Sequence, residues 1–221
     1  MSSIVVIPKY LRTSARLVNW RQGFSWAAKT AIFAHAALTP PGGDMSSTLL
    51  LEKNEMARIL DRLASQVLER HARCENVMLV GIQRRGADLA RRLGALIEAR
   101  LGAPVPLGTL DINLYRDDWT SLEGKPHIGQ SNIPGSVDER VILLVDDVLF
   151  SGRTVRAALE ALLDYGRPRA VELLVLIDRG HRELPIHADY VGRVVNTSRH
   201  EHVDVLLEER DGEDAVRLGD S

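Results

Sequence analysis

A run of five aliphatic residues, Val-Ile-Leu-Leu-Val at 141–145, places the strongest limit on the fold. A strand that is apolar at every position must be covered on both faces, as strands are in the middle of a parallel sheet. Similar runs recur at Val77–Ile82 and Val171–Ile177, and segments with helical spacing separate them. This alternation predicts an α/β domain with a central, mainly parallel sheet flanked by helices.

The segments between these runs carry apolar residues at i, i+3 and i+4, which is typical of amphipathic helices. The first helix is expected from residue 52 to about Arg73, and the second around Leu89–Ile97. A third is expected over Val155–Leu163, with Gly166 and Pro168 ending it. Each helix is long enough to cover part of a sheet.

The remaining segments predict strands and one long loop. Residues 115–136 are polar, rich in Gly, Pro and Ser, and lack periodicity. Loops of this length in compact domains are usually functional, so we expect a mobile hood loop there. Further strands are expected at Val105–Leu114, 190–195, 203–208 and 214–218.

The first 44 residues differ in composition from the rest. They contain five bases and one acid, and they end in Thr-Pro-Pro-Gly-Gly at 39–43. A start of this kind fits a targeting peptide, a disordered tail, or a mis-assigned start codon with Met45 as the true first residue. We therefore expect 1–44 to be an extension, disordered or mis-assigned, and 45–221 to be the folded domain.

Composition excludes several classes of protein. No run of 18 apolar residues occurs, so we expect no membrane span and no membrane partner. The single cysteine, Cys74, excludes an intrachain disulfide framework and fits the cytoplasm. The chain has 28 bases and 30 acids, so removing the extension leaves 23 and 29, a net charge of −6. Nucleic acid could therefore bind only through a local basic patch.

The residues that follow the central run carry the chemistry. Asp146 and Asp147 come directly after it, and Ser151-Gly152-Arg153-Thr154 leads into the next helix. Ligands of open α/β sheets bind beyond the carboxyl ends of the strands, and a helix start offers N–H groups to phosphate. Paired carboxylates repel phosphate but suit ribose hydroxyls or hydrated Mg²⁺. The segment predicts a ribose-phosphate site, because two successive aspartates are rarer than a single aspartate that caps a helix.

This segment resembles the phosphoribosyl pyrophosphate (PRPP) motif of type I phosphoribosyltransferases. Further motifs, Val80–Gly86, Asp111–Asp118, Arg153–Ala157 and Asp178–Ile186, resemble the PyrR family of bifunctional pyrimidine operon regulators and uracil phosphoribosyltransferases. The resemblance covers about residues 50–218 and implies a type I phosphoribosyltransferase fold. It also implies transfer of ribose 5-phosphate from PRPP to uracil, giving UMP and pyrophosphate.

The resemblance also assigns roles to residues. It places the pyrophosphate at Arg84, Arg85 and Gly86, and the uracil edge near Arg179 and Val203. Mg²⁺ is expected to arrive with PRPP, without a direct protein ligand. Asp146, Asp147 and Arg116 are the expected catalytic residues. The ribose and 5-phosphate are expected at Asp111 and at Asp146, Asp147, Val148, Leu149, Phe150, Ser151, Gly152, Arg153 and Thr154.

PyrR proteins also regulate, because some bind pyrimidine-operon mRNA in the presence of UMP and promote transcription termination. The resemblance places that RNA surface at Arg62, Arg182 and Arg193. The chain departs from the family pattern at Asp61, Ser65 and His187, and an acid at 61 would repel phosphate. Relatives form dimers or larger homo-oligomers. Two alternatives are a UMP-sensing attenuator with little enzyme activity and a type I transferase for another base, which the Asp178–Ile186 motif disfavours.

Overall fold

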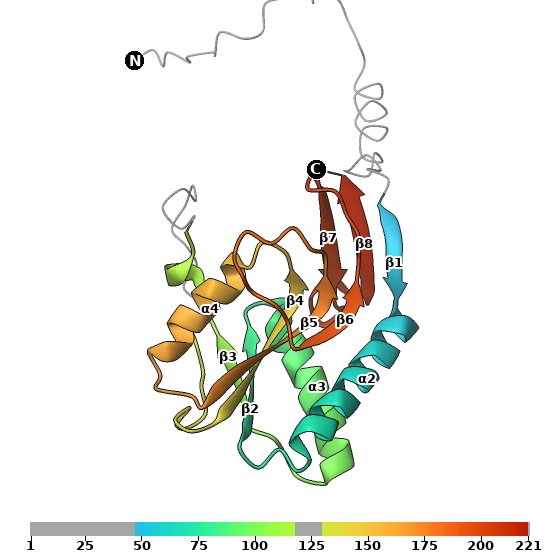
Figure 1. Ribbon diagram of the computed structural model, residues 1–221. Helices are drawn as coiled ribbons and strands as arrows, with labels where there is room; N and C mark the ends of the chain where they lie inside the picture. Colours follow the sequence, from blue (N-terminus) through green and yellow to red (C-terminus); the bar gives the residue numbers. More distant parts are fainter. Residues whose placement is uncertain (1–46, 118–129, 221) are drawn as a thin grey trace, which may run out of the picture. The chain divides into compact units, whose positions relative to one another are not determined.

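The computed structural model describes residues 47–117 and 130–220 (Figure 1). Five strands form one sheet in which every neighbouring pair is parallel, in the order β3-β2-β4-β5-β6. This confirms the α/β architecture and the central position of the aliphatic run. The strands are β2 (Val77–Ile82), β3 (Leu107–Leu110), β4 (Val141–Leu149), β5 (Ala170–Asp178) and β6 (Tyr190–Val194).

Helices cover both faces of this sheet, as a strand without polar positions requires. Helices α2 (Lys53–His71) and α3 (Arg85–Leu101) pack on the face that contains Leu143 and Val145 of β4. Helix α4 (Arg153–Leu163) packs on the other face, against Ile142 and Leu144. The alternate residues of β4 thus belong to two separate cores. The three predicted helices are confirmed by α2, α3 and α4.

A second, antiparallel sheet has the order β1-β8-β7 and was not predicted as a separate unit. Strand β1 (Thr48–Glu52) lies where no strand was expected, because it runs into α2 without a turn residue between them. Strands β7 (Glu201–Leu206) and β8 (Ala215–Asp220) lie within about two residues of their predicted positions. The four-residue helix α5 (Glu208–Asp211) connects them.

The strand expected at Val105–Leu114 was too long. Strand β3 ends at Leu110, and a 3-10 turn follows at Asn113–Tyr115. Asp111 causes this change, because its Oδ1 accepts the N–H of Asn113 at 2.8 Å and bends the chain.

Parts of two other predictions fall outside the described residues. For the hood loop these are 118–129, and its far side joins β3 through an antiparallel bridge between Thr109 and Asn132. The extension 1–44 lies entirely outside them. Over 47–117 and 130–220, no helix has both the length and the apolar character needed to cross a membrane.

Candidate active site

The two carboxylates lie within β4, at the carboxyl edge of the parallel sheet. Pairing of β4 with β2 ends at Val145, whereas pairing with β5 continues to Leu149. Asp146 and Asp147 therefore extend past the end of β2 but stay fixed to β5. The Oδ1 atom of Asp146 accepts the N–H of Asp147 at 3.0 Å, and that of Asp147 accepts the N–H of Val148 at 2.9 Å. Strand pairing holds the backbone of both residues, and these hydrogen bonds orient the two side chains.

Burial makes this carboxylate pair electrostatically costly. The Asp146 side chain is buried, which raises its pKa well above the ordinary value, and the neighbouring charge of Asp147 raises it further. Burial also raises the pKa of Asp147, and the nearby Arg85 guanidinium opposes that rise. A cation or a set of hydroxyl donors at this position would relieve the excess negative charge.

The turn between β2 and α3 packs tightly against the edge of β4. A Cβ atom on Gly86 would lie 2.4 Å from the carbonyl oxygen of Val145, and one on Gly81 would lie 2.4 Å from the Cα of Ala87. Only glycine fits at these two positions. The turn also contains a cis peptide bond between Gln83 and Arg84. This packing places the first turn of α3 directly beside Asp146.

The two arginines of this turn have different environments. The Arg84 side chain is exposed, while that of Arg85 is half-buried and contacts Asp211 through Nη2 at 3.1 Å. The Nε atom of Arg85 is buried without a hydrogen-bond partner. A base at a helix start opposes the helix dipole, so an anion beside Arg85 is favourable. In the structure the Asp211 carboxylate is such an anion.

A second group of the predicted site residues lies at the start of α4. Gly152 precedes the helix with φ of 91°, a conformation that favours glycine. A cavity of about 220 Å³ opens there. It is lined by Arg116, Asp117, Ser151, Arg153 and Thr154.

Acidic residues hold Arg153 at the edge of this cavity. Its Nε donates to Glu183 at 2.7 Å and its Nη1 to Asp117 at 2.9 Å. Asp117 also accepts from Arg156 at 2.8 Å. The cavity therefore contains both the hydroxyl groups and the guanidinium that can bind a phosphate. The guanidinium of Arg153 is at the same time paired with carboxylates.

Arg179 joins the parallel sheet to the segment before β7. Its guanidinium lies 4.1 Å from the centroid of the Phe150 ring and donates to Thr197 Oγ1 at 3.2 Å and to the Ser198 carbonyl at 3.0 Å. Burial lowers its pKa. Val203 is half-buried on β7 and packs against the core on the α2 and α3 side. Val148 and Leu149 are the last residues of β4, and Phe150 connects them to Ser151 at the cavity.

The residues assigned to RNA do not form one group. Arg62 and Arg193 line an open cavity of about 400 Å³ between α2 and β6, together with Arg58. Arg182 instead uses all three of its guanidinium nitrogens inside the protein, on the Ile186 carbonyl, other backbone carbonyls and Asp178. Of the three departures, Asp61 and Ser65 lie on α2 with Arg62, whereas His187 lies in the segment between β5 and β6. Asp61 pairs with Arg100, Ser65 donates to the Asp61 carbonyl, and His187 is exposed.

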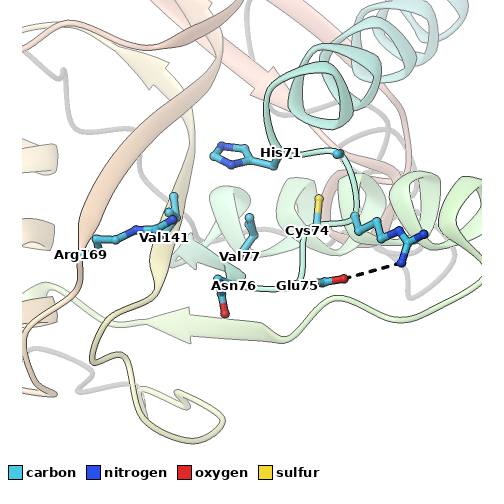
Figure 2. A pocket seen from close by; sticks show the side chains of 9 residues that line it. His71, Cys74, Glu75, Asn76, Val77, Val141 and Arg169 are labelled. Carbon is cyan, nitrogen blue, oxygen red and sulfur yellow. Dashed lines mark ion pairs between the residues drawn. The ribbon is translucent and has the colours of Figure 1, made fainter.

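A further cavity, of about 360 Å³, lies at the opposite edge of the sheet (Figure 2). It is formed by the turn after α2 and by Val77 and Val141, the first residues of β2 and β4. Figure 2 shows His71, Cys74 and Arg169 around it. None of the residues predicted for the site lines it.

Sequence reasoning missed the acidic partners of the site arginines. Asp117, Glu183 and Asp211 hold Arg153 and Arg85, and Glu183 and Asp211 come from segments far along the chain. Asp117 and Glu183 belong to the motifs Asp111–Asp118 and Asp178–Ile186, but nothing in their spacing indicated a contact with Arg153. No local pattern marks an ion pair between positions 85 and 211.

Comparisons with known proteins agree with this geometry. The phosphoribosyl transferase domain family matches residues 46–210. The bifunctional protein PyrR of Pelotomaculum thermopropionicum is 52% identical over 167 residues, which are 76% of this chain and 92% of that protein. The PyrR protein of Deinococcus radiodurans is 48% identical over 171 residues, 77% and 93% of the two chains.

Solved structures share the fold at lower identity. The hypoxanthine phosphoribosyltransferase of Trypanosoma cruzi has a TM-score of 0.60 at 15% identity, covering 81% of this chain and all of that one, 100%. The hypoxanthine-guanine enzyme of Leishmania tarentolae, in complex with GMP, has a TM-score of 0.57 at 18% identity, covering 80% and 98%. These likenesses concern the fold, and they confirm the fold expected from the sequence.

Proposed function

This chain belongs to the PyrR family within the phosphoribosyl transferase domain family, and we propose that it transfers ribose 5-phosphate from PRPP to uracil. The products would be UMP and pyrophosphate. One observation carries this proposal. Asp146, which is buried, and Asp147, which is half-buried, come shortly before Ser151 in the chain, and Ser151 lines a cavity with Arg153 and Thr154 at the start of α4. A carboxylate pair for the ribose hydroxyls thus adjoins a cradle for the 5-phosphate.

The chemistry follows from how charge changes during the transfer. Pyrophosphate leaves the anomeric carbon with growing negative charge, and the Arg85 guanidinium and backbone of the Gly86 turn would stabilise it. The sugar becomes oxocarbenium-like and positive, and the Asp146 and Asp147 carboxylates would stabilise that charge. The rigid pairing of β4 with β5 fixes these carboxylates before substrate binds, so little reorganisation is needed.

The carboxylates also fit the Mg²⁺ that accompanies PRPP. Oxygen ligands suit this ion, and it usually keeps several waters, so carboxylates can bind it through water. Asp111 also indicates a ligand here, because its Oδ2 atom is buried without a hydrogen-bond partner. We propose that Asp111, Asp146 and Asp147 face the hydrated ion. Bound Mg²⁺ would neutralise charge on the pyrophosphate, and Arg116 at the cavity would contact the substrate.

A direct assay tests the transferase proposal. The purified chain is incubated with uracil, PRPP and Mg²⁺, with and without residues 1–44, and UMP is measured. Asp146→Asn or Arg153→Ala should lower UMP formation at least about tenfold, which is roughly 1.4 kcal/mol in the barrier. Asp204→Asn and Arg167→Ala are matched controls at exposed positions outside the site. Wild-type rates in both site variants would show that the assignment is wrong.

We propose, second, that the chain binds a hairpin of pyrimidine-operon mRNA in the presence of UMP and promotes transcription termination. The supporting observation is the cavity between α2 and β6, where Arg58, Arg62 and Arg193 gather. Asp61, which would repel phosphate, is paired with Arg100, and this pairing offsets its charge. A local basic patch can therefore form although the domain is acidic as a whole.

The salt dependence of binding tests the RNA proposal. Each phosphate that the protein contacts adds about 0.7 to 0.9 to the slope with which log affinity falls against log salt concentration. Arg58→Ala should weaken binding of a leader hairpin and reduce that slope by about one contact. Arg217→Ala, on β8, is the control. If wild-type protein with UMP binds no hairpin at low salt, the RNA proposal fails while the transferase proposal stands.

We further propose that the protein works in the cytoplasm as a dimer or larger homo-oligomer. Sedimentation velocity of the purified chain tests the assembly, and a purely monomeric profile at micromolar concentration would contradict it.

A further inference from the structure

The short helix α5 holds the turn assigned to pyrophosphate from outside the parallel sheet. Arg210 forms an ion pair with Asp88 through Nε, and its Nη2 donates to the carbonyl of Arg84 at 3.3 Å. The next residue, Asp211, contacts Arg85. Two consecutive residues of α5 therefore contact three positions of one turn, although more than 120 residues separate the two segments.

Asp211 is itself held in place. Its Oδ2 atom accepts the N–H of Leu207 at 2.9 Å, so the carboxylate cannot rotate freely. Its two oxygens lie 3.1 and 3.3 Å from a single atom of Arg85, Nη2. The contact therefore engages one of the three guanidinium nitrogens. The buried Nε of Arg85 has no hydrogen-bond partner.

The electrostatic surroundings place Arg85 between two acids. Its positive charge opposes the rise that burial causes in the pKa of Asp147 on one side. On the other side it adds to the hydrogen bond from the Leu207 N–H in lowering the pKa of Asp211. The guanidinium thus lies within electrostatic reach of the carboxylate pair on β4. A flexible arginine loses rotamer freedom when it binds a ligand, and a partner that already holds it removes most of that cost.

We infer that Asp211 is a positioning residue, which holds the Arg85 guanidinium so that its remaining N–H groups face the pyrophosphate of PRPP. This inference rests on the proposed transferase function. A competing carboxylate would occupy two nitrogens in a fork, as a phosphate does, and would have to leave before substrate binds. Asp211 engages one nitrogen, so it can stay in contact while pyrophosphate binds.

The test compares Asp211→Asn with Glu209→Gln. Asparagine keeps an oxygen for the N–H of Leu207 but removes the charge that holds Arg85. Glu209 lies on the same helix and pairs with Arg92 at 2.9 Å, without contacting Arg85. Both variants lose one negative charge from α5, so a general effect of charge or stability appears in both.

For Asp211→Asn we expect the KM for PRPP and the Kd for pyrophosphate to rise about three- to tenfold, the range that immobilising one long side chain predicts. The kcat and the Kd for UMP, which has no pyrophosphate, should stay within about twofold of wild type. Glu209→Gln should match wild type in all four quantities. Calorimetric titration with PRPP and with pyrophosphate, both with Mg²⁺, measures the binding without turnover.

Three outcomes would overturn the inference. Unchanged or tighter PRPP binding by Asp211→Asn would mean that the carboxylate is idle or competes with substrate. Equal weakening in Glu209→Gln, or loss of UMP binding together with PRPP binding, would indicate a general structural effect. A wild-type protein that binds PRPP but forms no UMP would refute the transferase proposal, and the binding comparison would still decide the part that Asp211 plays.

Discussion

Replacing Gly86 by alanine tests whether the close contact between α3 and β4 builds the site. The new Cβ would lie 2.4 Å from the Val145 carbonyl oxygen and 3.1 Å from the Asp146 Cα. Ordinary van der Waals contact begins near 3.4 Å, so the two backbones must separate by about 1 Å. Both neighbours are backbone atoms of a strand paired with β5, and neither can rotate away as a side chain would.

Two magnitudes follow from this 1 Å displacement. Overpacking of this kind typically costs about 1 to 3 kcal/mol of unfolding free energy. A shift of about 1 Å in a catalytic group can cost on the order of 100-fold in rate. Gly94→Ala in the same helix is the control, because its Cβ would lie 3.3 Å from the flexible Leu79 Cδ1. The stability that Gly94→Ala loses through crowding is offset by the higher helix propensity of alanine, which is worth about 0.8 to 1 kcal/mol.

The assay combines urea unfolding with UMP formation for both variants. Gly86→Ala should lower the free energy of unfolding by about 1 to 3 kcal/mol. It should also lower the rate of UMP formation by more than the loss of folded protein explains, because a sample that is still more than about 95% folded would react slowly. Gly94→Ala should stay within about 1 kcal/mol of wild type and keep its rate. If Gly86→Ala kept both stability and rate, the contact would not determine the geometry of the site.

Two further changes act on buried acids. Burial raises the pKa of Asp146 above its value in the unfolded chain. Stability is therefore lost as pH rises from the unfolded-chain pKa towards the folded-state pKa, because the unfolded chain ionises first. Asp146→Asn should therefore unfold at a higher temperature than wild type at pH 7, with the gain vanishing below about pH 4 in thermal scans. An unchanged difference between pH 4 and 7 would contradict this. Glu172 is buried and accepts from His71, Tyr190 and Arg70 at 2.8, 2.8 and 3.0 Å. Glu172→Ala should cost about 2 to 4 kcal/mol in urea unfolding, and a loss under about 1 kcal/mol would refute the reasoning.

The parallel sheet could be predicted because its signal is local. The run 141–145 must be buried on both faces, and the helical spacing around it leaves few alternatives. Strand β1 was not predicted, because Glu52 and Lys53 join the strand to the helix without a glycine, proline or asparagine between them. Its identity as a strand depends on β8, which lies more than 160 residues away. Local patterns cannot reveal such a partner.

The same limit applies to the site. Asp146, Asp147 and the turn that follows could be identified because they are adjacent in sequence and their chemistry fits one ligand. The structure adds what surrounds them, such as the Asp117 carboxylate on Arg153 and the contact of Arg179 with Phe150. It also shows that Arg182 is committed to internal contacts, which a basic residue in a polar motif does not indicate.

The antiparallel sheet has a consequence for the order in which the protein assembles during synthesis. All five strands of the parallel sheet end by Val194, so that sheet can form while later residues are still being added. The antiparallel sheet needs β1, the first strand of the described residues, and β8, which ends at Asp220. Pairs so distant in sequence close slowly. Strand β7, which carries Val203 of the uracil edge, would therefore be fixed last, and a product shortened before β8 would also lose Val216 from the core on the α2 and α3 side.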